Sequence, residues 1–221
     1  MNLREDLDRR LAGASVVPLI AEDDPVVAVR IAKALQAGGL TVIEVVLRSG
    51  RALQGMEAII AETEGLIVGA GTVLTRQQAV EADRAGSAFV VCPGLVDDLV
   101  EYCLGKALPV YPGTMTAGEV QRAYALGLRE VKFFPASLAG GVPMLRAFGS
   151  VFRDMRFMPT GGVSASNLAE FLALPHVMAC GGSWLTPPDA VAKGDFATIE
   201  RLAREAIEIA ARARNRELCN V

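Results

Sequence analysis

Residues 41–73, TVIEVVLRSGRALQGMEAIIAETEGLIVGAGTV, contain the pattern that predicts the fold. The stretch begins with the apolar run TVIEVVL (41–47) and ends with a second one, LIVGAGTV (66–73). A segment with helical spacing joins the two runs. Near-continuous apolar runs of this length are typical of parallel strands covered on both faces. The stretch is therefore predicted to form a strand, a crossover helix and a second parallel strand.

Runs of the same kind recur along the chain at VVPLIAE (16–22), FVVCPG (89–94), PVYPGT (109–114), EVKFFPA (130–136), FMPTGG (157–162) and VMACGGSW (177–184). The eight units are each roughly 20–27 residues long, near the minimum for a strand with its crossover helix. They predict an α/β protein with one domain over 1–221, a single (β/α)8 TIM barrel. A helix over 1–14 would lie outside the repeat, and 214–221 would form a C-terminal tail. An open doubly wound sheet is the alternative, but its GxGxxG fingerprint is absent after the first strand.

The composition excludes several classes of function. The chain has 22 Lys and Arg against 25 Asp and Glu and no basic run, which argues against a nucleic-acid partner. Its one histidine leaves almost no room for a His-based metal site or a Ser-His-Asp triad. No apolar run reaches about 18 residues, so we expect no membrane span. Cys92, Cys103, Cys180 and Cys219 lack CxxC spacing and are interpreted as reduced thiols of a cytoplasmic protein.

Two charged residues lie in or directly after the run at 41–47. Side chains alternate between the two faces of a strand, so Glu44 and Arg48 are predicted to share a face with Val42 and Val46. Burying charges beside valines costs free energy unless the charges are paired or take part in chemistry. A structural Glu–Arg ion pair, or an outward-facing strand end, would also explain the pattern. We favour a functional site, because Arg48 comes at the carboxyl end of the strand, where barrels carry their chemistry.

A third charge, Lys132, lies in the apolar run at 130–136, flanked by valine and phenylalanine. Desolvation lowers the pKa of a buried lysine, and a neighbouring guanidinium lowers it further. A lysine that is neutral near pH 7 can act as a nucleophile and form a Schiff base. The alternative is a structural lysine whose stem covers apolar surface while its amine reaches water. Because Glu44, Arg48 and Lys132 are predicted to meet at one barrel mouth, we favour the catalytic interpretation.

Glycine-rich segments end three of the predicted strands. GAGTV (69–73) places the Thr72 hydroxyl at a strand end, and PTGG (159–162) and CGGSW (180–184) end the last two strands. Glycines let backbone N–H groups approach a ligand closely, and the loops after barrel strands seven and eight commonly bind phosphate. Ser183 adds a hydroxyl donor. Tight turns would explain one pair of glycines, but two pairs at these two strand ends favour a phosphate site.

Six short motifs follow one another along the chain: IEVVLRS (43–49), VGAGTVL (68–74), PG (93–94), KFFPA (132–136), FMPTGG (157–162) and CGGSWL (180–185). Their order and spacing resemble those of the family of 2-keto-3-deoxy-6-phosphogluconate (KDPG) and 4-hydroxy-2-oxoglutarate (KHG) aldolases. The resemblance implies a cytoplasmic, homotrimeric (β/α)8 class I aldolase of the Entner–Doudoroff pathway, without metal or cofactor. Its substrate would be a phosphorylated keto acid, which it would cleave to pyruvate and glyceraldehyde 3-phosphate. KHG would give pyruvate and glyoxylate.

The resemblance also implies a role for each matching position. Lys132 would form the Schiff base, and Glu44 would be the general acid and base. The pyruvate end would be bound by Arg48 and Thr72 and lined by Pro93 and Phe134. The phosphate end would be bound by Gly161, Gly162 and Ser183, and Thr160 and Gly182 would also bind substrate. Ser49, the segment 137–141 and the loop 111–116 depart from the family pattern and could alter substrate selectivity.

Three alternatives to this function stay open. A 2-keto-3-deoxy-6-phosphogalactonate aldolase would use the same lysine, although Thr160 is typical of the gluconate type. A phosphosugar isomerase or decarboxylase would share the phosphate loops without needing a lysine imine. A barrel that only binds phosphorylated metabolites would catalyse nothing.

Overall fold

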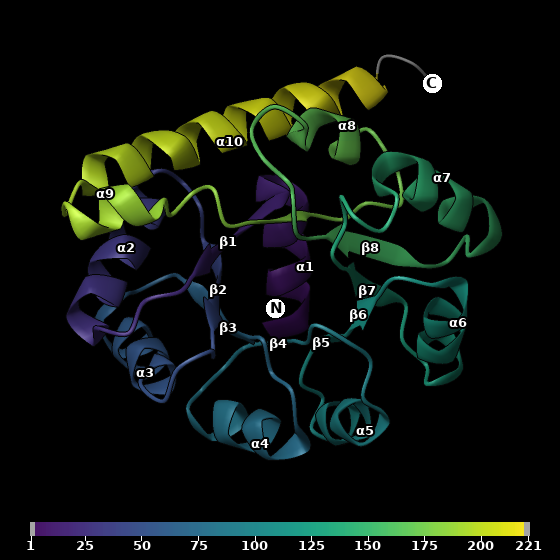
Figure 1. Ribbon diagram of the computed structural model, residues 1–221, viewed down its shortest axis with the longest axis horizontal. Helices are drawn as coiled ribbons and strands as arrows, with labels where there is room; N and C mark the ends of the chain where they lie inside the picture. Colours follow the sequence, from purple (N-terminus) through teal and green to yellow (C-terminus); the bar gives the residue numbers. More distant parts are fainter. Residues whose placement is uncertain (1–2, 219–221) are drawn as a thin grey trace.

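The computed structural model describes residues 3–218, and side chains from residue 4 to residue 215. Parallel strands alternate with helices along the chain (Figure 1). The strands are β1 (Val16–Ile20), β2 (Val42–Val46), β3 (Ile67–Gly71), β4 (Val90–Val91), β5 (Val110–Tyr111), β6 (Gly113–Thr114), β7 (Glu130–Phe133), β8 (Arg156–Pro159) and β9 (Cys180–Gly182). The helices are α1 (Leu3–Ala14), α2 (Pro25–Ala37), α3 (Ala52–Glu62), α4 (Arg76–Arg84), α5 (Asp97–Gly105), α6 (Ala117–Ala125), α7 (Gly141–Val151), α8 (Leu168–Leu172), α9 (Pro188–Ala192) and α10 (Phe196–Leu218).

The strands form two parallel sheets, which confirms the predicted α/β class. One has the order β5-β4-β3-β2-β1-β9 and the other the order β6-β7-β8. Only Pro112 separates β5 from β6, so one predicted run is divided between the two sheets. Isolated parallel bridges, Phe157 with Val177 and Thr160 with Gly181, join the β8 and β9 segments. Each of the eight predicted runs contains a strand, and the strands are shorter than the runs because many runs end in glycine or proline.

The strands are buried on both faces, and the two faces belong to different apolar clusters. An outer cluster, beneath the helices, includes Ile43 and Val45 of β2. An inner cluster includes Val42 of the same strand. Val131 and Phe133 of β7 also belong to the outer cluster. Because side chains alternate along a strand, the residues between these outer positions point to the inner face. Those residues are the ones at positions 44 and 132.

Side-chain caps set the start of several helices. The Asp24 carboxylate accepts a hydrogen bond from the backbone N–H of Val26, and Pro25 follows it as the first residue of α2. Thr116 and Glu119 form a capping box at the start of α6. Such caps satisfy backbone N–H groups that have no partner within the helix. Each cap marks the residue at which a loop ends and the next helix begins. The caps therefore limit the length of the loops after the strands, which carry candidate site residues.

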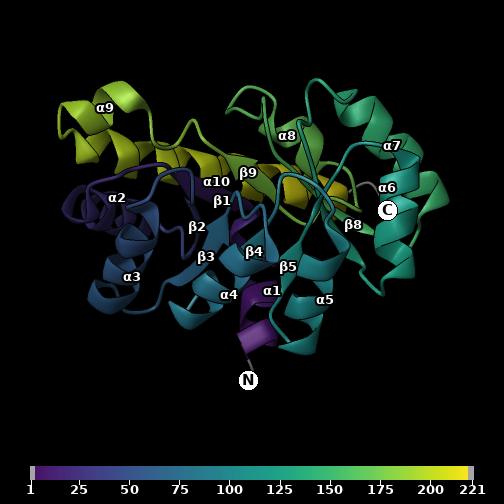
Figure 2. The same ribbon diagram turned by 60° about the horizontal axis from the view of Figure 1, so that its bottom comes forward.

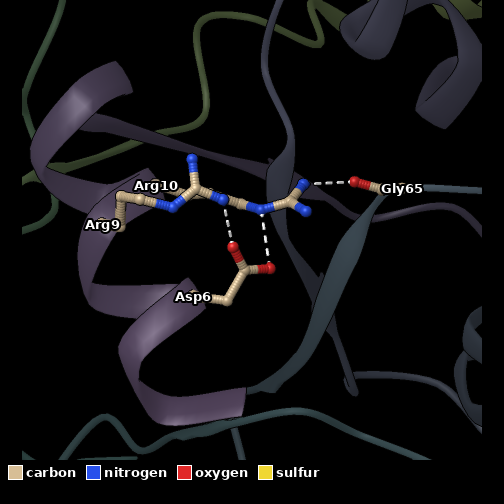
Figure 3. Close-up of polar contacts among 4 residues, drawn as sticks. All are labelled: Asp6, Arg9, Arg10 and Gly65. Atoms are coloured by element: carbon tan, nitrogen blue, oxygen red, sulfur yellow. Dashed lines mark hydrogen bonds and ion pairs between the residues drawn. The ribbon is translucent and has the colours of Figure 1, made fainter. Parts of the chain in front are cut away.

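Helix α1 covers the end of the sheets at which the strands begin (Figure 2). Its Leu7 and Leu11 are buried in the inner cluster. Asp6 forms ion pairs with Arg9 and Arg10, and Arg10 also donates to the carbonyl of Gly65, just before β3 (Figure 3). The helix predicted over 1–14 is observed over 3–14.

The C-terminal segment differs from the prediction. Helix α10 continues to Leu218, so residues 214–218 of the expected tail are helical. The small side chains of Ala203, Ala206, Ala210 and Ala213 recur along one face of α10 and are buried in the outer cluster, so the packing that stabilises the helix extends beyond its middle. Met1, Asn2 and residues 219–221, including Cys219, lie outside the described residues.

Truncating Leu7 tests the contribution of α1 to the fold. We expect Leu7→Ala to lower the free energy of unfolding by about 2–5 kcal/mol, because it leaves a cavity in the inner cluster. The matched control is Leu138→Ala, since Leu138 is 87% exposed and little burial is lost there. Denaturant unfolding measures both variants. Equal free energies of unfolding for the two variants would contradict the packing of α1 against the inner cluster.

Candidate active site

Two oppositely charged side chains face each other inside the sheet structure. Glu44 comes from the middle of β2 and Lys132 from β7. Lys132 Nζ lies 3.9 Å from Glu44 Oε1. Glu44 is 0% exposed and Lys132 is 4% exposed. Two of the three charges that the sequence predicts to meet are therefore in contact, and both of these residues lie on the inner face.

The Glu44 carboxylate has few groups that stabilise its charge. Neither carboxylate oxygen has a hydrogen-bond partner among the described residues. Burial therefore raises the pKa of Glu44, while the positive charges of Lys132 and Arg48 act in the opposite direction. The carboxylate packs directly against the backbone of Gly71, where any Cβ would overlap with it. Glycine at this position makes room for the acid in an otherwise filled interior.

The backbone around Lys132 fixes the position of its side chain. The Lys132 N–H donates to the carbonyl of Pro112 at 2.9 Å. Its carbonyl accepts from the buried hydroxyl of Thr114 at 3.0 Å. The ammonium nitrogen lies 4.9 Å from the centre of the Phe134 ring, within the range of a cation–π interaction. The lysine is thus held by two segments of backbone, with an aromatic wall on one side.

Phe134 also lines a cavity of about 520 Å³ at the carboxyl ends of β1, β2, β8 and β9. Six residues singled out from the sequence line it: Arg48, Phe134, Thr160, Gly161, Gly162 and Ser183. Arg48 reaches the cavity in a way that the sequence does not predict. Strand β2 ends at Val46, and the Arg48 N–H donates to the Val46 carbonyl, so Arg48 lies in a turn and is exposed. Strand alternation therefore does not place Arg48, contrary to our expectation.

The glycines at the cavity have conformations that other residues adopt only with strain. Gly161 and Gly162 have φ of +91° and +79°. A Cβ on Gly162 would overlap with the Ser137 hydroxyl, and one on Gly181 would overlap with Thr160. The backbone conformation and the lack of space for a Cβ therefore explain glycine at these positions without any role in binding. A binding role is compatible with this structural explanation, because Gly161, Gly162 and Gly181 also line the cavity.

The remaining predicted site residues lie around the Glu44–Lys132 pair or next to the cavity. Thr72 follows β3 with a positive φ of 56°. The carbonyl of Pro93 packs against Gly113, the residue paired with Lys132 between β6 and β7. Gly182 does not line the cavity, whereas Gly181 does. Gly181 belongs to the second glycine pair of the predicted phosphate site, in CGGSW (180–184). Glu22, another lining residue, was not predicted, although it is an acid at the end of a predicted strand.

Other groups offer less chemistry. Burial raises the pKa of the Cys92 thiol to about 12, so this cysteine stays protonated near neutral pH. Within residues 3–218, no group of three or more His, Cys, Asp or Glu side chains is arranged to hold a metal ion. No helix in the same range has the length and apolar character needed to span a membrane.

Comparison with known proteins agrees with this geometry. The family model for KDPG and KHG aldolase matches residues 7–202. The chain belongs to this aldolase family. It is 44% identical over 207 residues to the KHG/KDPG aldolase of Escherichia coli K12, covering 94% of this chain and 97% of that protein. It is 43% identical over 202 residues to the 2-dehydro-3-deoxy-phosphogluconate aldolase of Pseudomonas aeruginosa, covering 91% and 92%.

Solved structures of aldolases from the family share the fold. The 2-keto-3-deoxy-6-phosphogluconate aldolase of Zymomonas mobilis ZM4, solved with 3-phosphoglycerate, has a TM-score of 0.86 and 41% identity, covering 91% of this chain and 95% of that one. The KDPG aldolase of Legionella pneumophila, with pyruvate captured as a covalent carbinolamine, has a TM-score of 0.87 and 35% identity, covering 90% and 97%.

The raised pKa of Glu44 can be tested by titration. Unfolded glutamate has a pKa of about 4.3. The native state keeps its proton to a higher pH, so this group stabilises the fold fully at low pH, and the stabilisation is lost as the pH rises through the raised pKa. In a carbon-13 NMR titration, we expect the one carboxyl signal that disappears in Glu44→Gln to titrate above the exposed glutamates.

The same variant gives a second measurement. The free energy of unfolding of the wild type should fall relative to that of Glu44→Gln as the pH rises above about 4.3. A Glu44 signal that titrates with the exposed glutamates would contradict the burial of an uncompensated acid.

Proposed function

We propose that this aldolase cleaves KDPG to pyruvate and glyceraldehyde 3-phosphate through a Schiff base on Lys132, and cleaves KHG to pyruvate and glyoxylate. The buried Lys132–Glu44 pair, 3.9 Å apart, is the observation that carries the proposal. Neither charged residue lines the cavity itself, but Phe134, whose ring centre is 4.9 Å from Lys132 Nζ, does. Family membership supports the reaction class. The carbinolamine of the Legionella relative supports covalent capture of pyruvate in the family.

The first stage forms the imine. The neutral amine of Lys132 adds to the C2 carbonyl carbon of the keto acid, and the carbonyl oxygen takes up a proton to give a carbinolamine. Loss of water then leaves a protonated imine. The buried surroundings of Lys132 favour this stage, because imine formation expels water.

The second stage breaks the C3–C4 bond. The Glu44 carboxylate accepts the proton of the C4 hydroxyl, directly or through one water. The electron pair of the C3–C4 bond moves to the imine, which leaves an enamine and releases the aldehyde. Glu44 then returns a proton to C3, and water hydrolyses the imine to pyruvate and free Lys132. A carboxyl group whose pKa burial raises is suited to this role, because the shift brings its exchange of protons closer to neutral pH.

The two ends of the substrate require different groups. We assign the carboxylate beside C2 to Arg48 and Thr72, because a guanidinium grips a carboxylate with two charge-assisted hydrogen bonds. Pro93 and Phe134 would line this part of the site. We assign the distal phosphate to Thr160, Gly161, Gly162, Gly182 and Ser183. The 3-phosphoglycerate in the Zymomonas structure supports a phosphate-bearing ligand in the family.

The proposal extends to the architecture and assembly. We infer that both sheets belong to one (β/α)8 TIM barrel forming a single domain over 1–221, with α1 outside the repeat. The division at Pro112 and the bridges between the β8 and β9 segments support this inference. We also propose a homotrimer, from the family resemblance, which light scattering would test. A cytoplasmic location, testable by cell fractionation, is supported by the free, buried thiols of Cys92, Cys103 and Cys180.

Trapping the imine tests the mechanism. We expect borohydride with pyruvate to add one reduced pyruvyl group to the wild type, with the label on Lys132, since reduction makes the Schiff base permanent. Lys132→Met should lose both the label and the cleavage of KDPG. The matched control, Lys106→Met, removes an exposed lysine and should keep both. Peptide mass spectrometry locates the label. An unlabelled wild type, or a label on another lysine, would exclude the mechanism.

Substituting Ser183 tests the phosphate end without backbone strain. Ser183→Ala removes one hydrogen bond to a charged group, worth about 1.5–3 kcal/mol or roughly 10–100-fold in kcat/KM for KDPG. KHG has no phosphate, so its kcat/KM should change little. Ser150→Ala, an exposed serine on α7, is the control. Steady-state kinetics with both substrates gives the comparison, and equal losses on KDPG and KHG would remove Ser183 from the phosphate site.

A further inference from the structure

The cavity carries an acidic residue that the mechanism does not use. Among the described residues that line it, Arg48 is the only cationic one and Glu22 the only acidic one. Arg48 is already assigned to the carboxylate of the substrate. The groups assigned to the distal phosphate are neutral hydroxyls and glycine backbones. A dianionic phosphate would therefore enter a cavity in which the remaining fixed charge is negative.

The strand pairing places Glu22 beside the proposed phosphate end. Strand β1 runs parallel to β9, with Pro18 opposite Gly182. The next residues along the two strands are Leu19 and Ser183, and the Thr186 hydroxyl donates to the Leu19 carbonyl at 2.8 Å. The segment after β9 is thus tied to the end of β1. Glu22 lies three residues beyond that hydrogen bond and lines the same cavity as Ser183.

The Glu22 side chain is held in place by its own loop. Its Oε1 accepts hydrogen bonds from the backbone N–H groups of Asp23 and Asp24, at 2.8 and 2.9 Å. These donors are neutral, so they orient the carboxylate without cancelling its charge. No ion pair joins Glu22 to a basic side chain among the described residues. The negative charge at this side of the cavity is therefore a fixed feature of the loop between β1 and α2.

We propose that Glu22 is a specificity-determining residue that weakens the preference for a phosphorylated distal end, an inference that rests on the proposed aldolase function. Its carboxylate repels a phosphate dianion but has no such effect on the uncharged terminal hydroxyl of the unphosphorylated six-carbon keto acid. The cavity is thereby biased towards accepting both substrates. Asp23, next in the same loop, has the same charge but does not line the cavity.

The experiment compares kcat/KM for KDPG with kcat/KM for the same keto acid without phosphate. We expect Glu22→Gln to raise this ratio about 5-fold, the Coulomb effect of removing one negative charge on the order of 8 Å from a dianion in water. The glutamine keeps an oxygen that can accept the two backbone hydrogen bonds. Glu22→Asp, which keeps the charge, should leave the ratio near that of the wild type. Asp23→Asn, the matched control, should raise the ratio by less than Glu22→Gln does, because Asp23 does not line the cavity.

Raising the salt concentration should shrink the difference between Glu22→Gln and the wild type, because exposed charges are screened. The inference about Glu22 would be overturned if Glu22→Gln left the ratio of the two kcat/KM values unchanged, or if Asp23→Asn raised that ratio equally. Cleavage of the substrates by the wild type would still support the aldolase function in that case. A wild type that cleaves neither substrate and forms no imine with pyruvate would overturn both.

Discussion

The burial of an acid and a lysine side by side is the constraint around which the rest of the site is arranged. Two charges inside an apolar interior cost several kcal/mol each unless each compensates for the other. Glu44 and Lys132 partly compensate at 3.9 Å, but Glu44 makes no hydrogen bond within the described residues. The pair is therefore not optimised as a structural ion pair. The proposed imine mechanism gives this arrangement a purpose, since it needs an acid that can exchange a proton beside the reacting amine.

The surrounding fold accommodates the Glu44–Lys132 pair without disrupting the packing of the apolar clusters. Parallel strands bring residues that are distant in the sequence to one face, and the alternation of side chains keeps the neighbours of Glu44 and Lys132 in the outer cluster. Gly71 and Gly113 leave space where side chains would otherwise fill the interior. Helix α1 fills the opposite end with leucine side chains. One end of the strands thus contributes to stability, and the other holds the cavity and the candidate site.

Much of this arrangement can be predicted from local pattern. The apolar runs locate the strands, and the period of two places Glu44 on the face opposite Ile43 and Val45. The positions of residues that depend on contacts between distant parts of the chain cannot be predicted from local sequence pattern. Arg48 reaches the cavity through a turn, where strand alternation no longer applies. Glu22 looks like the last residue of an apolar run, and its place beside Ser183 depends on the pairing of β1 with β9, which the sequence does not display. The length of α10 depends on packing under its alanines.

Helix α1 covers the end at which the strands begin, and this affects the order in which substrates bind and products leave. Leu7 and Leu11 block the inner face on one side, while the cavity opens at the other. In the proposed mechanism the pyruvyl portion would be attached to Lys132, which is 4% exposed, and the aldehyde would lie between it and the solvent. Under that mechanism the aldehyde would have to diffuse out before the enamine is protonated and the imine hydrolysed. In the reverse direction, pyruvate must load first, so the synthesis of new carbon–carbon bonds by this protein would be ordered, with the aldehyde as the interchangeable second partner.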